Sequence, residues 1–291
     1  KEESYKAHRE YWLNTLSGEL PVLDLPSSKQ RPRLKTYNGC GLSTYIGSEI
    51  TRKLKEYTQQ NGGSLFMGLL ATWNVLMYRY TSQGDIIIGT PLAIREHVDL
   101  EDQIGFYINT LALRNEVDPQ ENFTTFYNRV KENTLKGYSH QMYPFDRLVE
   151  ELDLKRDTGR SPVFDISITY HNISEGKNIG QLVDKNINQI LPTASSKVKF
   201  DVELHFQEIG EYISFYLAYN EDLYDSGLAE QLINHFRQLL YSVLCTPEIK
   251  LSEVEYLSEE EKKNLLYSFN DTAVAYPKDK TIVELFESQV K

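Results

Sequence analysis

The stretch Asp85-Ile86-Ile87-Ile88-Gly89-Thr90 predicts a central strand of a β-sheet. A short, continuous run of β-branched residues suits a strand that is covered on both faces, because neither face then needs polar side chains. Just before it, Leu65–Tyr80 is apolar on nearly every side, which predicts a buried helix with Ser64 as its N-cap. A buried helix followed by a buried strand indicates an α/β fold.

Further elements are predicted on both sides of this pair. Residues 3–17 have helical spacing, and an apolar extended segment over residues 21–32 is expected to lie along a surface. Ser48 is predicted to cap a helix over 49–60, and Asp225 a helix to about Leu244. The other predicted helices lie near 122–138 and 144–152, and the other strands over 104–114, 163–170, 198–207 and 212–220. The mixture predicts helices covering a mixed sheet.

The composition disfavours several classes of partner. The 31 Lys and Arg against 42 Asp and Glu give a net charge of −11, which disfavours nucleic acids and anionic membranes. No apolar run is long enough to cross a bilayer, and the first residues do not begin a secretory signal. Cys40 and Cys245 follow no metal-ligand spacing, and two thiols without a disulfide framework predict a reducing cytoplasm.

By themselves the residues indicate no catalytic site. The sequence contains no G-x-S-x-G, P-loop, G-x-G-x-x-G or H-E-x-x-H motif. Six histidines stand singly along the chain, and such a residue is more often at the surface or the edge of a core than a catalytic base. They are His8, His97, His140, His171, His205 and His235. Composition and spacing alone therefore predict an α/β domain without metal ligands.

A series of short motifs adds information, because they occur in a fixed order. They are YWLNTLSG at 11–18, LDLP at 23–26, GTPLAIR at 89–95, IGFYINTLALR at 104–114, HQMYPFD at 140–146, RDTGRSPVF at 156–164, KFD at 199–201 and NHFRQLL at 234–240. In this order they resemble the core motifs of the condensation domains of nonribosomal peptide synthetases. Ile94, Met142, Gly159 and Ser161 depart from the residues that are usual in the family.

The resemblance implies a fold and a division of the chain. Condensation domains consist of two chloramphenicol-acetyltransferase-like lobes in a V, with a tunnel at their junction, and residues 41–250 resemble the C-terminal lobe. Residues 1–40 resemble a lead-in helix and extended segment from a missing N-terminal lobe. Residues 251–291 resemble a linker and the start of an adenylation domain, with a short charged helix beginning at Ser258 and a second over Thr281–Val290.

The resemblance also implies an activity. The family joins an upstream carrier-bound acyl or peptidyl thioester to the amine of a downstream carrier-bound aminoacyl group. The family's catalytic histidine belongs to an HHxxxDG motif, which these 291 residues lack. We therefore expect no catalytic residue and no activity in this chain alone. The implied partners are the N-terminal lobe, both carrier domains and the following adenylation domain, and phosphopantetheine comes with the carriers rather than as a directly bound cofactor.

Five residues are carried over as site candidates. The family's motif Asp pairs with an Arg, which corresponds to Arg95; the alternative is an ordinary surface cation. Asn109 and Tyr107 are expected on one side of a tunnel-lining strand, although Asn109 could instead tie two backbone segments together. Lys199 and Asp201, with Glu203, share the polar face of a predicted strand and either border the tunnel or meet water.

Other functions stay open at this point. A non-catalytic condensation-like module that docks carrier proteins predicts a broken histidine motif upstream. A free-standing acyltransferase that uses coenzyme A predicts no adenylation domain downstream, and the FNDT sequence at 269–272 argues against it. An epimerisation domain is a weaker alternative, because it normally continues differently after the last helix.

Overall fold

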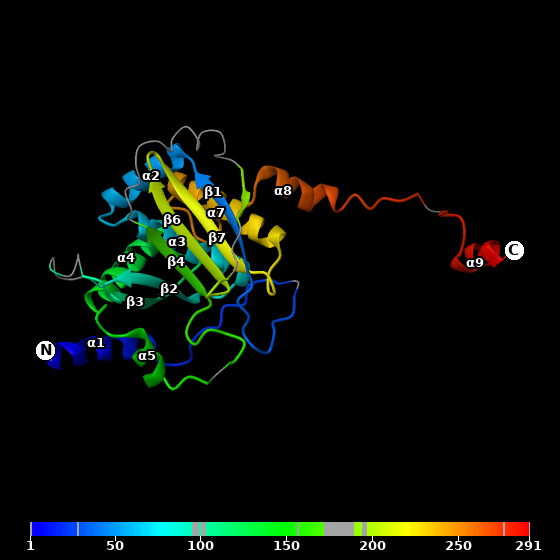
Figure 1. Ribbon diagram of the computed structural model, residues 1–291. Helices are drawn as coiled ribbons and strands as arrows, with labels where there is room; N and C mark the ends of the chain where they lie inside the picture. The colour runs from blue at the N-terminus through cyan, green and yellow to red at the C-terminus, as the bar shows by residue number, and fades with distance from the viewer. Residues whose placement is uncertain are drawn as a thin grey trace. The chain divides into compact units, whose positions relative to one another are not determined.

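The computed structural model describes residues 2–27, 29–94, 99, 103–155, 157–171, 189–193, 197–275 and 277–290. The chain divides into two compact units, Lys1–Tyr256 and Leu257–Lys291. The first unit contains the sheet and most of the helices (Figure 1). None of the helices that the structure describes is long and apolar enough to span a membrane.

A seven-stranded mixed sheet forms the centre of the first unit, in the order β3-β2-β4-β6-β7-β1-β5. Two neighbouring pairs, β2–β4 and β4–β6, are parallel, and the other pairs are antiparallel. The strands are β1 (Gly39–Ile46), β2 (Asp85–Ala93), β3 (Ile108–Glu116), β4 (Ile166–His171), β5 (Leu191–Thr193), β6 (Val202–Ile209) and β7 (Tyr212–Asn220). The predicted strand at Asp85 is confirmed as an interior strand, and strands β1 and β5 were not predicted.

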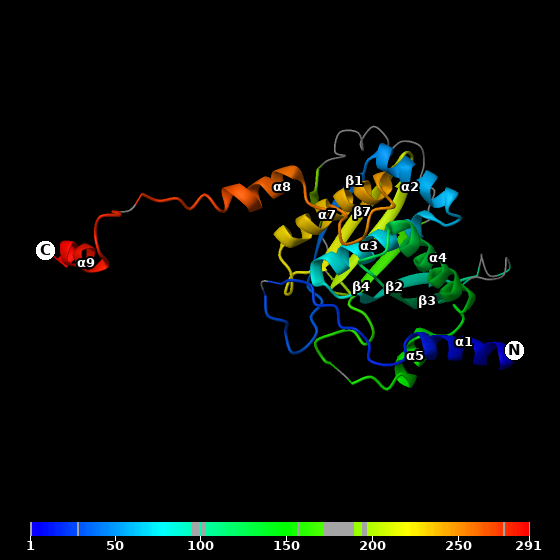
Figure 2. The same cartoon turned by 180° about the vertical axis from the view of Figure 1, so that it is seen from behind.

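Helices cover one face of this sheet. Among the residues that the structure describes, the helices of the first unit are α1 (Glu2–Thr15), α2 (Ser48–Gln60), α3 (Leu65–Thr81), α4 (Phe123–Ser139), α5 (Phe145–Glu151) and α7 (Ser226–Cys245). In Figure 1 helices α2, α3, α4 and α7 lie behind the sheet, and in Figure 2 they lie in front of it. Helix α3 is buried along most of its length, as its sequence predicts.

The two faces of the sheet differ in chemistry. The helix-covered face is apolar, and its buried side chains include Ile88, Leu111, Leu204 and Phe215. The opposite face carries polar residues that the strand registers place side by side: Ser167 next to Glu203, and Thr169 next to His205. Among the residues that the structure describes, no helix lies over this second face. Sheets normally leave a face uncovered where that face is polar, so the exposed face follows from the sequence.

The helix caps partly follow the predictions. Ser64 caps α3 by accepting a hydrogen bond from the N–H of Met67, and Asp225 caps α7 by accepting one from the N–H of Leu228 at 2.8 Å. The prediction that Ser48 caps α2 is wrong. That helix begins one residue earlier, so Gly47 is the N-cap and makes no side-chain cap bond.

Replacing the cap of α7 tests how much this helix depends on it. Asp225→Ala is expected to lower the free energy of unfolding by about 1 kcal/mol, because an N–H at the helix start loses its acceptor. Asp225→Ser, which restores an acceptor, should recover most of that loss in urea titrations. Equal losses in the two variants would show that capping is not the cause.

The second unit is small and helical. The short charged helix predicted to begin at Ser258 is helix α8 (Glu259–Lys263), which Ser258 caps, and α8 continues into a π-helical turn, η2 (Asn264–Ser268). A third segment is helix α9 (Ile282–Val290). Its apolar side chains Ile282, Val283, Phe286 and Val290 are all exposed. An amphipathic helix with exposed apolar residues has no core of its own.

Candidate functional site

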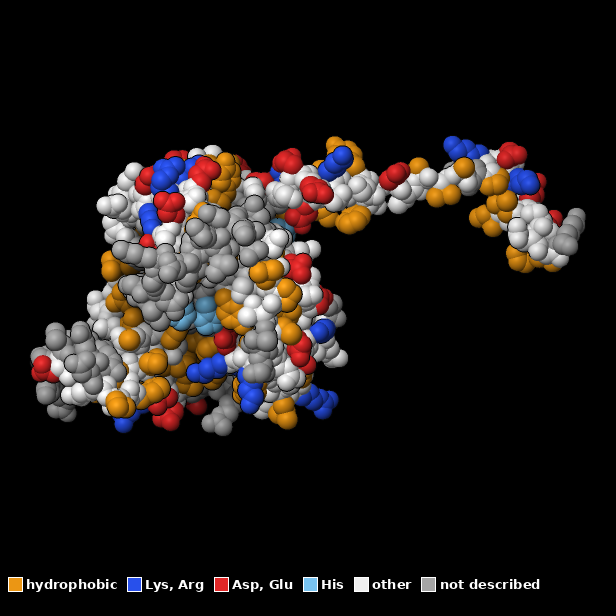
Figure 3. Space-filling model, turned by 45° about the horizontal axis from the view of Figure 1, so that its top comes forward, with side chains coloured by type: hydrophobic (Ala, Val, Ile, Leu, Met, Phe, Trp, Pro, Cys, Tyr) orange, Lys and Arg blue, Asp and Glu red, His pale blue; other side chains and the backbone are white. Residues whose placement is uncertain are grey.

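A groove of about 610 Å³ lies on the helix-free face of the sheet. Four strands and the start of α5 form its walls, so residues far apart in sequence meet there. Figure 3 shows histidine side chains at the edge of a hollow on the surface of the molecule. The strand residues that line the groove include Pro91, Thr110, Ser167, Thr169, Glu203 and His205, and Phe145, Asp146, Lys199 and Phe200 complete the walls.

Glu203 and His205 form the main titratable pair of this groove. The Oε2 atom of Glu203 lies 3.6 Å from Nε2 of His205, and its Oε1 atom accepts backbone hydrogen bonds from Lys199 at 2.5 Å and Phe200 at 3.0 Å. Burial opposes ionisation of Glu203, but the hydrogen bonds from His205 and the backbone outweigh it. They hold the pKa of the Glu203 carboxyl below its usual range, which keeps it a carboxylate at neutral pH.

His171 extends this pair along the neighbouring strand. Its Nε2 atom lies 3.3 Å from Nδ1 of His205, and the two rings are stacked with their centroids 5.6 Å apart. Burial, together with the nearby His205, lowers the pKa of His171, so that its ring is neutral at physiological pH. The expectation that the histidines stand singly is therefore wrong for these two, and also for His8 and His140, whose Nδ1 atoms lie 3.0 Å apart. The parallel pairing of β4 and β6 brings His171 and His205 together.

Asn109 lines the groove and is nearly saturated with hydrogen bonds. Its Nδ2 donates to the carbonyls of Gln141 and Tyr143, both at 2.7 Å, and its Oδ1 accepts from the N–H groups of Thr110 and Phe145. The side chain is only 9% exposed. This geometry favours the structural interpretation, in which the amide ties the loop between α4 and α5 to strand β3.

The other candidates are distributed differently. Lys199 lines the groove, whereas Tyr107 precedes β3 and is not among the lining residues; its hydroxyl donates to Gln103 at 3.0 Å. Strand β3 begins one residue later, at Ile108, and the carbonyl of Tyr107 accepts a hydrogen bond from the N–H of Ile94 at 2.8 Å. That Tyr107 lines the tunnel stays a prediction. Arg95 lies outside the described residues.

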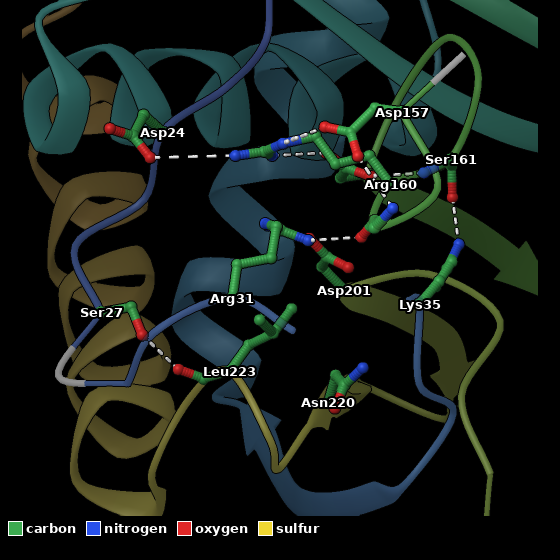
Figure 4. A network of polar contacts seen from close by, with 12 residues as sticks. Asp24, Ser27, Arg31, Lys35, Asp157, Arg160, Ser161, Asp201, Asn220 and Leu223 are labelled. Carbon is green, nitrogen blue, oxygen red and sulfur yellow. Dashed lines mark hydrogen bonds and ion pairs between the residues drawn. The ribbon is translucent and has the colours of Figure 1, made fainter. Parts of the chain in front are cut away.

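Asp201 belongs to a separate buried network (Figure 4). The expectation that it shares a polar face with Lys199 is wrong, because residues 199–201 form a bend and β6 begins at Val202. The carboxyl of Asp201 is 1% exposed, and its Oδ2 accepts a hydrogen bond from Arg31 at 2.6 Å. Burial raises the pKa of Asp201, and the hydrogen bond from Arg31 opposes that rise.

Residues of the 156–164 motif complete this network. Arg160 donates to Oδ2 of Asp165 at 2.8 Å, the N–H of Ser161 donates to its Oδ1, and Arg31 donates to the carbonyl of Gly159. Lys35 donates to Ser161. These bonds tie the extended segment after α1 to the start of β6, so the network has a structural role.

The 140–146 motif anchors helix α1. The indole N–H of Trp12 donates to the carbonyl of His140 at 2.9 Å, and the ring of Tyr11 stacks on His140 with centroids 4.1 Å apart. Tyr143 donates to Glu151 at 2.7 Å. The motif therefore joins α1, α5 and, through Asn109, the wall of the groove.

Comparison with known families matches this architecture. The family model described as the condensation domain matches residues 1–266. The chain belongs to the condensation-domain family. Gramicidin S synthase 2 of Brevibacillus brevis is 39% identical over 290 residues, and surfactin synthase subunit 1 of Bacillus subtilis (strain 168) is 39% identical over 287. Each match covers 99% of this chain, but only 6% and 8% of those two proteins.

Solved structures show the same fold. A four-domain nonribosomal peptide synthetase bound to AMP and glycine superposes with a TM-score of 0.77 at 22% identity, over 88% of this chain and 20% of that one. The X-domain from teicoplanin biosynthesis gives a TM-score of 0.75 at 22% identity, over 87% of this chain and 57% of that one. The predicted condensation-domain fold, with its mixed sheet and covering helices, is confirmed.

Proposed function

We propose that this chain is the C-terminal lobe of a condensation domain, and that its helix-free sheet face lies against a second lobe. The groove on that face carries the proposal, because it exposes apolar side chains that a second lobe would cover. Phe106 is 87% exposed and Ile108 is 53% exposed, and both line the groove. Exposed apolar residues beside a polar groove are typical of an interface.

The remaining segments fit the same assignment. Residues 41–250 are proposed as the lobe itself and residues 1–40 as the lead-in from the other lobe. Residues 251–291 are proposed as the linker and the start of an adenylation domain, which would cover the exposed apolar residues of α9. Arg95 is proposed as the partner of the Asp of the histidine motif, across the lobe junction.

The assembled domain is proposed to form amide bonds. It joins an upstream carrier-bound acyl or peptidyl thioester to the amine of a downstream carrier-bound aminoacyl group. Both substrates arrive on phosphopantetheine arms of carrier domains, and holding them end to end accelerates the reaction through proximity. The HHxxxDG motif is absent from these 291 residues, so the chain by itself is proposed to be inactive. Free Cys40 and Cys245 suit a cytoplasmic enzyme.

The two groove residues Asn109 and Lys199, and two candidates outside the groove, have distinct proposed roles. Asn109 positions the wall by holding the α4–α5 loop, and Lys199 borders the open end of the groove. Tyr107, whose carbonyl accepts a hydrogen bond from the N–H of Ile94, is proposed to hold the segment that leads to Arg95. Asp201 acts only through the buried network.

We further propose that this groove, once covered by the second lobe, holds the reacting ends of the two substrates. Filling the groove tests this in the synthetase module that contains this chain, with its carrier domains. Thr169→Trp places a large ring on the floor of the groove. The rate of amide formation is expected to fall about ten-fold or more, because the ring would keep one reactant from lying close to the other. The matched control is Thr125→Trp at an exposed position on α4, which should leave the rate unchanged.

Thr169→Ser should also retain activity, and thermal unfolding should show that all three variants fold. Unchanged amide formation in a folded Thr169→Trp variant would contradict the proposal that this groove holds substrates.

A further inference from the structure

His205 is the residue of the groove that is best placed to take up a proton. Both of its ring nitrogens face a hydrogen-bonding partner: Nε2 lies 3.6 Å from the Glu203 carboxylate, and Nδ1 lies 3.3 Å from Nε2 of His171. Both side chains line the groove, and Oε1 of Glu203 also accepts hydrogen bonds from two backbone N–H groups. One residue therefore joins the groove to two supporting groups.

The partners fix where protons sit. An ionised carboxylate only accepts hydrogen bonds, which favours the tautomer in which neutral His205 carries its proton on Nε2 and accepts at Nδ1 from His171. When His205 is protonated, both ring nitrogens donate, and His171 accepts after moving its own proton to Nδ1. The added charge is then balanced by Glu203. The hydrogen-bonding groups of the trio His171, Glu203 and His205 therefore have partners both with and without one extra proton.

We propose that His205 accepts the proton that the α-ammonium group of the acceptor aminoacyl thioester must lose before its nitrogen can attack. This proposal rests on the proposed amide-forming function. In the first step the ammonium group gives one proton to His205, which leaves a neutral amine and an imidazolium. The amine then attacks the upstream thioester carbonyl, and the C–S bond breaks. The nitrogen then loses a second proton, which the leaving thiolate takes up to become the free thiol, and His205 returns the first proton to water.

The charges around His205 fit a cationic group. Glu203 lies on the same strand, His171 on β4, and the ring of Tyr216 on β7 is 5.6 Å away. In the groove, Asp146 of α5 adds a negative charge and Lys199 a positive one. The neutral state of the trio carries the single negative charge of Glu203, which attracts an ammonium group and is compensated once the proton has moved.

The pH dependence of amide formation tests this role in the intact module. His205→Gln keeps hydrogen-bonding groups but cannot take up a proton. An α-amino group has a pKa of about 7.7–8.0, so only roughly one in twenty is neutral at pH 6.5. We expect kcat/KM for the natural acceptor to fall about ten-fold at pH 6.5 and to approach the wild-type value at pH 9, where the amine is already neutral.

An alkoxyamine acceptor separates proton transfer from structure, because its nitrogen is neutral throughout this range. With it, His205→Gln should match the wild type at every pH, and Glu203→Gln should behave in the same way. His8→Gln, outside the groove, should show no pH-dependent loss with either acceptor. A loss that is equal at all pH values and for both acceptors would assign His205 a structural role and overturn the proposal.

Two further results distinguish the proposals from each other. If Thr169→Trp abolishes amide formation while His205→Gln keeps the wild-type pH profile, only the proton-transfer proposal fails. If Thr169→Trp has no effect, the groove is not the site and both fail. Independently of activity, ¹⁵N spectra of the 291-residue chain at pH 8 should show the His205 proton on Nε2. A proton on Nδ1 would contradict the arrangement.

Discussion

Replacing Arg31 by methionine is expected to lower the free energy of unfolding by about 3–5 kcal/mol at pH 7, because the buried carboxylate of Asp201 loses its cationic partner. Methionine keeps much of the volume of the arginine stem but removes the donor that lies 2.6 Å from Asp201. The second carboxylate oxygen of Asp201 has no hydrogen-bond partner among the described residues, so nothing replaces the lost one. Urea unfolding of the 291-residue chain measures the loss.

The pH dependence and a double variant identify the cause. Without Arg31 the pKa of Asp201, already raised by burial, rises further. In the folded variant Asp201 then binds a proton at pH values where it is ionised in the unfolded chain. The free energy of unfolding of the variant therefore falls as the pH rises from the ordinary pKa of an Asp towards the raised pKa of Asp201. The difference in free energy of unfolding between wild type and variant should therefore become smaller as the pH is lowered from 7 towards 5. Arg31→Met with Asp201→Asn should regain most of the loss at pH 7; simple additivity of the two substitutions would argue against a coupled ion pair.

Asn109→Leu is expected to lower the free energy of unfolding by about 3 kcal/mol, because it leaves the carbonyls of Gln141 and Tyr143 and the N–H groups of Thr110 and Phe145 without this partner. The shape of the side chain changes little, so the loss reports on hydrogen bonding. Hydrogen exchange at the N–H of Phe145, which donates to Asn109 at 3.1 Å, should accelerate more than exchange in helix α3.

Asn115 offers a matched control on the same strand. It is also buried, but its Nδ2 has no partner among the described residues and its Oδ1 accepts one bond, from Asn133 at 3.2 Å. Asn115→Leu should therefore cost clearly less than Asn109→Leu. Equal costs would mean that burial of an amide, and not the bonds to the α4–α5 loop, explains the effect.

Local sequence patterns predicted most of the elements but missed strand β1. The predicted strand over 212–220 matches β7, and the buried helix after Ser64 matches α3. Strand β1 begins Gly39-Cys40-Gly41, and glycines weaken any strand prediction. Gly41 is needed there because the ring of Tyr216 occupies the place of a side chain: a Cβ would lie 2.4 Å from the tyrosine hydroxyl. Such a reason becomes visible only when two distant strands are paired.

The candidate site shows the same limit. The resemblance pointed to Asn109 and Lys199, and both line the groove. It did not point to His171 and His205, which lie 34 residues apart and meet through the register of parallel strands. The burial of Asp201 was also missed. The alternating sequence pattern includes residues 199–201, but the backbone bends there and strand β6 begins only at Val202. Period-two alternation is informative only inside a strand whose ends are known.

The pairing of β2 with β4 has a mechanical consequence. These strands are registered only at Gly89 and Ser167, whereas β2 and β3 pair along nine positions. Few backbone bonds must therefore break for the β2–β3 ribbon to tilt against the rest of the sheet, and the packing of α3 and α4 is left to resist that tilt. Since Gly89 and Ser167 both line the groove, a tilt of the β2–β3 ribbon about this short pairing would change the width of the groove.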